Sequence, residues 1–522
     1  MKRIITLLTI FLLTSTIGAQ VYKNGTNKYV AYRQSYGINL NAVVKSNYEG
    51  MAKGDNVVLT KLMCEECLDP NIGLKLLYTV KIGDKEIKVK NKIEKKLDFQ
   101  YKDVQDIWDS EIICNVLYEL GKYGIQEKMR LEMEEDALEY IYKVRSSGLE
   151  FKDPYLENYI YGLIAQIAPS TFIDGRPCSI NIVIIDDPSM NAGMFPNGTL
   201  SINTGLIAGL HTEDELVAVL SHEIAHFVLD HSVQNVNKVN ERKKRAEFWA
   251  ALATGFVAVT EGIAAVTSSY YIPGAATMAT AAMASSIANE VIEHLGMDYN
   301  HEQENEADEL SQKVLQCTGR DINALANAFA RMKENMKRER SSMMYFNSFS
   351  HPALVNRIEK IGNPDLSIKD KEFEKMVSFA VSSAARMKYE DRRFGQVLPL
   401  VTQNIDNGVA TTIDYILKAN CLLALKNDEN SNKEALSYVN KAKEIDPTNI
   451  NIYKTEILVT LRLGKKDEAL SLLKGYKEKL SNGYENYKDL IGSKFWESYF
   501  NFATEEIDWS NRMILKLGGM NL

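Results

Sequence analysis

Two histidines and a glutamate at a fixed spacing are the clearest chemical signal in the sequence. His222 and His226 lie four residues apart, with Glu223 directly after the first of them, in the run His-Glu-Ile-Ala-His. Side chains four residues apart share one face of a helix, so the two imidazoles can bind one metal ion. Glu223 is then placed to take a proton from a water molecule that the metal activates. The pattern predicts a metal-dependent hydrolase that cleaves peptide bonds.

A third protein ligand is expected further along the chain. One large group of zinc peptidases has a Gly and a third His soon after the second His, but Leu229 and Ser232 stand at those positions here. His231 is one residue out of register, so we expect it on the helix surface or at the helix C-terminal end. Glu304 can complete a His2Glu site that leaves the fourth position open for water. Asp308, on the same helical face, can accept the N–H of a ligating imidazole.

The elements that must position these residues can be predicted around the motif. Thr212 and Glu215 form a capping-box pattern at the start of the motif helix. The β-branched run 180–185 predicts a buried strand, and a turn leads from it into a second strand near 198–203. We expect this second strand at a sheet edge, where an extended substrate could pair with its backbone.

The N-terminus and the composition indicate an exported protein with several folded domains. Lys2 and Arg3 precede the apolar run 4–13, and small residues follow up to Ala19, which is the pattern of a cleaved signal peptide. A chain of 522 residues is too long to fold around a single hydrophobic core. Its content of 45% hydrophobic and 25% charged residues is typical of globular proteins. The net charge of −8 gives no reason to expect a nucleic-acid partner.

The six cysteines permit disulfides in an exported protein, but their connectivity stays open. Cys64 and Cys67 could be a redox pair, half of a zinc knuckle or a local disulfide. No second ligand pair matches a knuckle, and the turn at 68–70 does not suit a redox motif, which usually opens a helix. We interpret the pair as structural.

The two ends of the chain differ in their predicted structure. Residues 20–95 look β-rich, with a hairpin signal around Gly83-Asp84, and the pattern turns helical from 104 to 167. In the C-terminal third, the run 433–436 recurs as 467–470, an offset of 34 residues. That offset is the period of the tetratricopeptide repeat, although an ordinary helical bundle is the alternative.

Four elements stand out along the stretch 191–361: Asn203-Thr204-Gly205-Leu206, the His222–His226 motif itself, the segment Glu304–Asp308, and Ser350-His351-Pro352 followed by Arg357-Ile358. In these elements the stretch resembles the zinc metallopeptidase family that includes the CAAX prenyl protease and HtpX. With its signal peptide and repeats, the chain is most similar to the periplasmic BepA type of that family.

The resemblance implies one zinc ion bound by His222, His226 and Glu304, with Glu223 as the general base. Arg357 would either stabilise the oxyanion or anchor its segment to a carboxylate. His351 would either approach zinc as a fourth ligand, which excludes the attacking water, or cap the next helix.

Between the two metal motifs lies a weakly hydrophobic segment, 248–289. Relatives embedded in membranes have transmembrane helices here, but Glu261 and Pro273 interrupt the segment, and a basic cluster at 242–245 would lie on the wrong side for a span. A buried helical hairpin or a lid over the cleft is one interpretation. Contact with a membrane surface or a membrane-protein client is the other.

We therefore expect an α+β protein: a signal peptide (1–19), a β-rich N-terminal region (20–100), a zincin-like, mainly helical zinc metallopeptidase domain with a small sheet (101–370), and a tetratricopeptide-like helical repeat domain (371–522). The expected function is a zinc endopeptidase for unfolded or misassembled envelope proteins, with partner proteins bound by the repeats. The alternative is a chaperone or assembly scaffold for outer-membrane proteins with a latent or silent metal site. Glu223 argues against it, because a structural site needs no base.

Overall fold

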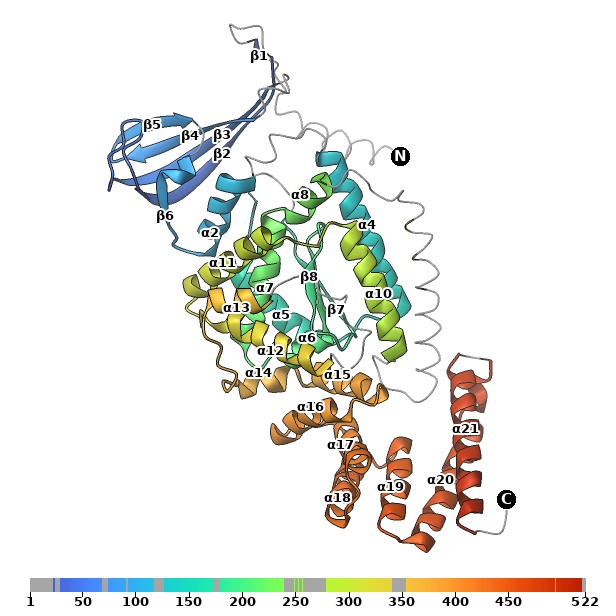
Figure 1. The fold of residues 1–522 in the computed structure, drawn as a ribbon. Helices are drawn as coiled ribbons and strands as arrows, with labels where there is room; N and C mark the ends of the chain where they lie inside the picture. Colours follow the sequence, from blue (N-terminus) through green and yellow to red (C-terminus); the bar gives the residue numbers. More distant parts are fainter. Residues whose placement is uncertain are drawn as a thin grey trace.

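Three parts follow one another along the chain in the computed structural model (Figure 1): a sheet, a mixed central part and a string of helices. The predicted signal peptide lies outside the described residues. The structure describes residues 22–23, 29–67, 74–90, 93–116, 126–172, 178–238, 248, 252, 256, 278–339, 354–492 and 494–518.

The N-terminal part is an antiparallel meander, which confirms the predicted β-rich region. Its strands are β1 (Tyr22–Lys23), β2 (Tyr29–Val44), β3 (Asn56–Cys67), β4 (Leu74–Ile82), β5 (Lys85–Lys90) and β6 (Leu97–Gln100). They are ordered β1 to β5, and β6 also pairs with β2. Ile82 pairs with Lys85 across the predicted two-residue turn, where Gly83 adopts a φ of +56° that suits glycine.

Helix α2 (Val104–Glu111) connects this sheet to the central part. Asp103 caps the helix by accepting the backbone N–H of Asp106. The indole of Trp108 is fully buried and donates a 2.8 Å hydrogen bond to the carbonyl of Ile167 in the next part. Apolar side chains of the sheet, of α2 and of the central helices form one continuous core, so the sheet is packed on the central part.

A small three-stranded sheet lies in the central part, with β9 (Thr199–Asn203) between β7 (Asn181–Ile185) and β8 (Ala192–Met194). β7 runs parallel to β9, and β8 runs antiparallel to it. Both predicted strands are present, but the expectation that the second one forms an edge is wrong. The short strand β8 lies outside it, because the chain doubles back at 191–198 and pairs with β9 before β9 can become an edge.

Helices surround this sheet, and α7 lies at their centre. They are α4 (Gln126–Ser147), α5 (Pro154–Ile167), α6 (Thr204–Gly209), α7 (Glu213–Val228), α8 (His231–Lys238), α10 (Met278–His294), α11 (His301–Cys317), α12 (Ala324–Glu339) and α13 (Leu354–Ile361). Every side chain of α7 from Glu215 to Val228 is buried, and the helix packs against α11 and α12. A helix buried on all faces needs partners for each of its polar groups.

The C-terminal helices continue from the central part. They are α14 (Lys371–Met376), α15 (Ser378–Glu390), α16 (Phe394–Asp406), α17 (Thr412–Leu425), α18 (Glu429–Ile445), α19 (Ile450–Arg462), α20 (Lys466–Asn486) and α21 (Lys494–Lys516). α15 packs against α6 and adds Ala380 and Ala384 to the central core. From α16 onward, each helix packs mainly on its neighbours in the chain. Ala435 and Ala469, equivalent in the predicted 34-residue repeat, are both fully buried.

Two sequence expectations depend on segments that are only partly described. Cys64 and Cys67 both lie in strand β3, where no helix opens as it would in a redox motif; their side chains lie outside the description. Of the segment 248–289, the structure describes α10 up to residue 289, together with the buried Phe248, Leu252 and Phe256. Within the described parts of the chain, a helix both long and apolar enough to cross a membrane is not found.

Candidate metal centre

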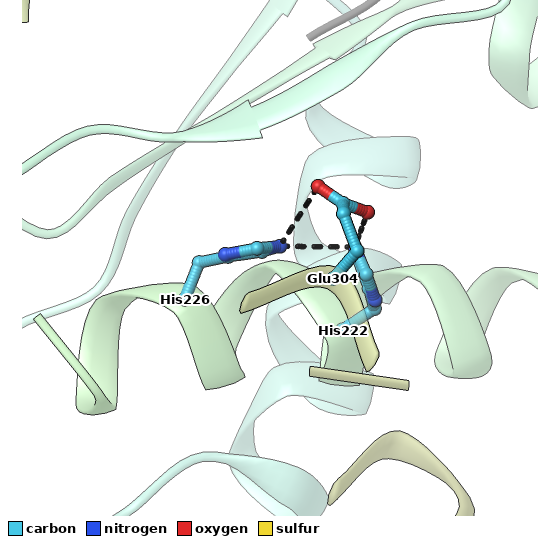
Figure 2. Close-up of side chains that lie close together, drawn as sticks. All are labelled: His222, His226 and Glu304. Atoms are coloured by element: carbon cyan, nitrogen blue, oxygen red, sulfur yellow. Dashed lines mark hydrogen bonds and ion pairs between the residues drawn. The ribbon is translucent and has the colours of Figure 1, made fainter. Parts of the chain in front are cut away.

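The structure brings His222, His226 and Glu304 together (Figure 2). The two imidazoles project from one face of α7, and the carboxylate comes from α11, which packs alongside. Thr212 caps α7 as predicted, whereas the carboxylate of Glu215 accepts the backbone N–H of His211 and pairs with Arg331. The capping box Asn300/Gln303 fixes the start of α11 one turn before Glu304. These two caps fix the residues at which α7 and α11 begin, and so which side chains of each helix face the cluster.

The spacing of the three donor atoms fits one small cation. The Nε2 atoms of His222 and His226 are 3.1 Å apart, and they lie 3.6 and 3.7 Å from the two carboxylate oxygens of Glu304. Ligand atoms arranged tetrahedrally around zinc, each about 2.0–2.1 Å from it, lie about 3.3 Å apart. Two imidazoles and one carboxylate are the donor set of catalytic zinc sites that keep a fourth position open. The residues present therefore fit zinc.

Asp308 orients the first of these histidines. Its carboxylate oxygen lies 3.0 Å from Nδ1 of His222, on the side of the ring away from the donor Nε2. Burial alone would raise the pKa of Asp308, but hydrogen bonds and charge from Arg357 and His222 outweigh it and hold the pKa below the ordinary value. An ionised Asp308 accepts the Nδ1–H and leaves the Nε2 lone pair of His222 free for a metal.

Arg357 anchors α13 to α11. Its Nε and Nη2 donate to the two oxygens of Asp308 at 2.8 and 2.6 Å, and its Nη1 pairs with Glu304. The guanidinium lies over the ring of Phe329, 4.2 Å from the ring centroid. Of the two roles that the sequence left open, this geometry matches the anchor to a carboxylate. A fork-to-fork pair suits the planar guanidinium, and the buried charges compensate one another.

His231 lies just past the C-terminal end of α7, one of the two places that the sequence left open, but it is buried there and does not lie on the helix surface. The residue begins α8, its side chain is only 1% exposed, and its Nδ1 lies 2.8 Å from Nδ1 of His226. Asp230, with a φ of +62°, turns the chain sharply after α7 and brings His231 back onto the metal cluster. Such a reversal leaves no mark in the spacing of residues, so the sequence offered no signal for it.

Tyr299 is a further neighbour of the cluster that the sequence did not indicate. Its ring stacks on His226, with ring centroids 3.7 Å apart and an angle of 10° between the planes. Its hydroxyl lies 3.0 Å from that of Ser232. Burial, with the charges of Glu223 and Glu304, raises the pKa of Tyr299 above its ordinary range, so the phenol stays neutral. The ring limits the space in which the His226 imidazole can rotate.

Glu223 lies beside the cluster without belonging to its donor set. It occupies the helical position after His222 and is only 2% exposed. Its charge acts on both Tyr299 and Arg357, raising the pKa of each. A general base must lie next to the metal position without being one of the metal ligands, and the carboxylate of Glu223 meets both conditions. His351, the candidate fourth ligand, lies outside the described residues.

The comparisons with known proteins concern the part of the chain that holds this cluster. Residues 154–365 match the model of peptidase family M48. The chain is 26% identical over 200 residues to a Vibrio cholerae protein assigned the name beta-barrel assembly-enhancing protease, a match that covers 38% of this chain and 37% of that protein. It is 37% identical over 59 residues to mitochondrial metalloendopeptidase OMA1 of Bos taurus, covering 11% of each chain.

A third relative is metalloprotease LoiP of Escherichia coli K12, 26% identical over 189 residues, which are 36% of this chain and 63% of LoiP. The chain thus spans less than two thirds of the length of each of these relatives. The family match includes every described residue of the cluster, from His222 to Arg357. Taken with the geometry of the donor atoms, these matches identify residues 154–365 as a metallopeptidase domain of family M48.

Proposed function

We propose that the chain is a zinc-dependent endopeptidase, with His222, His226 and Glu304 as the metal ligands and Glu223 as the general base. The observation that carries the proposal is the convergence of three donor atoms from α7 and α11, with a separate carboxylate beside them. A site built only for structure fills its coordination positions and needs no base.

Each residue of the site has a separate role in the proposed reaction. A bound zinc ion would polarise the substrate carbonyl and the attacking water. Glu223 accepts the proton of that water and returns it to the leaving amine. Asp308 holds the His222 ring in one tautomer, and Arg357 holds Asp308 and α13 in place.

Strand β8 is the part of the sheet along which a substrate backbone would pair. β9 is enclosed by strands on both sides, and β7 makes an outer antiparallel bridge between Ile185 and Glu150, so β8 lies at the remaining edge. A cavity of about 40 Å³ lies over one face of this sheet, between all three strands and α10, and its lining includes Ile185, Gly193 and Ile292.

The substrates that we propose are unfolded or misassembled proteins of the cell envelope, held by the C-terminal helices, which we assign to the tetratricopeptide type. Export through residues 1–19, a periplasmic location and contact of 248–289 with a membrane surface belong to the same proposal. It is supported by the N-terminal sequence pattern, the 34-residue spacing of the buried Ala435 and Ala469, and the names of the relatives.

A second candidate function is an assembly scaffold with a latent metal site. It is favoured by the burial of the reactive groups, because Glu223 and Glu304 are only 2% and 0% exposed. Latency and catalysis are compatible if a client exposes the buried site. If no client protein elicits proteolysis, the scaffold function would be the one that remains.

The test replaces Glu223 with Gln, which keeps the shape of the side chain and removes the base. Cleavage of an unfolded protein such as casein should fall by roughly 10²–10⁴-fold, while zinc content stays near one ion per chain. Glu309→Gln on the exposed side of α11 is the matched control and should cleave normally. Unchanged turnover in Glu223→Gln would contradict the assignment of the base.

A further inference from the structure

A chain of hydrogen-bonding groups leads from His226 to the protein surface. Nδ1 of His226 lies 2.8 Å from Nδ1 of His231, and Nε2 of His231 lies 3.1 Å from a carboxylate oxygen of Glu306. The His231 side chain is 1% exposed, whereas that of Glu306 is 51% exposed. The chain therefore runs from a buried imidazole through a second buried imidazole to a carboxylate in water.

Several contacts hold His231 in this position. Asp230, in the left-handed backbone region, forms an ion pair with Arg130 of α4, which fixes the reversal between α7 and α8. The backbone carbonyl of His231 accepts a hydrogen bond from Nε2 of Gln303, at 3.4 Å. A non-glycine residue with positive φ is uncommon and persists only where surrounding contacts determine it. The position of His231 is therefore set by the fold around it.

The two ligand histidines have different outer partners. His222 is oriented by a carboxylate, Asp308, whereas the outer nitrogen of His226 meets an imidazole that is backed by Glu306. The order of these contacts determines which ring nitrogen of His226 and of His231 carries a proton. Glu306 has no proton to give when ionised, so Nε2 of His231 donates to it, and Nδ1 of His231 is then the acceptor for the Nδ1–H of His226. This tautomer leaves the Nε2 lone pair of His226 directed at the metal position.

We propose that His231 is a positioning residue, which fixes the tautomer and ring orientation of His226 through Nδ1 and thereby sets the zinc affinity of the site. The inference rests on the proposed function, because it presumes that the cluster binds zinc. Glu306 supports His231 from the surface. A histidine that only filled space in the core would act through its volume, whereas this role requires an acceptor atom at one place.

Three substitutions separate the two possibilities. His231→Leu keeps apolar volume without an acceptor, His231→Ala removes both, and His231→Asn retains an oxygen that can take the place of Nδ1. Zinc affinity is measured by competition with a chelator of known affinity. Partners of ligand histidines typically contribute 10–100-fold in metal affinity, so Ala and Leu should weaken binding by roughly that factor, and Asn by much less.

A second readout and two further variants keep the test decisive. The absorption spectrum of the Co²⁺-substituted protein should change in the Leu variant and remain close to wild type in the Asn variant. Glu306→Gln, at a half-exposed side chain, should fold normally and weaken zinc binding by a few-fold. His294→Ala is the control, because His294 is also buried and pairs with a carboxylate, Asp136 at 2.9 Å, outside the metal cluster.

The possible outcomes are distinguishable. A wild-type protein that binds no zinc would overturn the proposed function itself. Equal zinc affinity in wild type and in the Ala, Leu and Asn variants would overturn the role of His231 alone. An affinity that follows side-chain volume, with Leu near wild type and Asn weak, would show that His231 acts by packing.

Discussion

Two buried aspartates, one in the metal centre and one among the C-terminal helices, show how differently the two regions are stabilised. Asp308 contacts the guanidinium of Arg357 and the ring of His222, and these partners hold its pKa below the ordinary value. Among the described residues, the hydrogen-bond donors to Asp414, in α17, are all neutral, and burial raises its pKa. Its donors are the hydroxyl of Ser382, the amide of Asn404, and the backbone N–H and hydroxyl of Thr411.

The two regions also differ in how far apart along the chain their contacting residues lie. Arg357 lies 49 residues from Asp308, and a contact between Arg357 and His222 spans 135 residues. Helices α17 to α21 instead pack mainly on adjacent helices through small apolar clusters. The metal centre is a network of charges in which each group depends on the others. The C-terminal helices are a stack in which most contacts join neighbouring helices, so that a change should stay local.

The largest effect should follow from Arg357→Ala, which leaves Asp308 and Glu304 buried without their cation. Removing one partner of a buried ion pair destabilises a protein by about 3–5 kcal/mol. Chemical denaturation should show this loss in the central part, together with weaker zinc binding. Arg338→Ala is the matched control, because the Arg338 side chain is 58% exposed and pairs with Glu334 one turn away. That surface pair should contribute less than about 0.5 kcal/mol. Equal stability in the two variants would contradict the network.

A smaller and local effect is expected from Ala435→Leu in α18. Ala435 is fully buried against α17, and a larger side chain in a packed core costs about 1–3 kcal/mol. Zinc content should stay at the wild-type level while the C-terminal helices unfold earlier, as measured by hydrogen exchange across α17–α20. Loss of metal in this variant would show that the two regions are coupled more tightly than their contacts indicate.

The smallest effect concerns pH and Asp414→Asn. Because the folded-state pKa of Asp414 is raised, the folded protein holds this proton more tightly than the unfolded chain. The group's contribution is therefore most favourable below its unfolded pKa, and stability is lost as the pH rises from there through the raised folded pKa. Asp414→Asn should flatten the stability profile above the ordinary pKa of an aspartate, as followed by denaturation at each pH. An unaltered slope would contradict the assignment.

Much of the metal cluster could be predicted because its geometry is local. The four-residue spacing of His222 and His226 becomes a shared helical face wherever a helix forms, and the same periodicity links Glu304 to Asp308. The N-terminal hairpin was predictable for a similar reason, since Gly83 and the alternation around it specify a two-residue turn. Buried strands at 181–185 and 199–203 also followed from composition.

What the sequence alone determined was thus the periodic part: which residues share a helix face and which segments form strands. Tertiary structure decided the rest. The position of β8 outside β9, the return of His231 onto His226, the stacking of Tyr299 and the pairing of Arg357 with Asp308 all join segments that meet only when α7, α8, α11 and α13 are packed. Helix periodicity is imposed by the backbone over a few residues. Contacts between distant segments depend on the burial of all their side chains at once, and no local spacing encodes that.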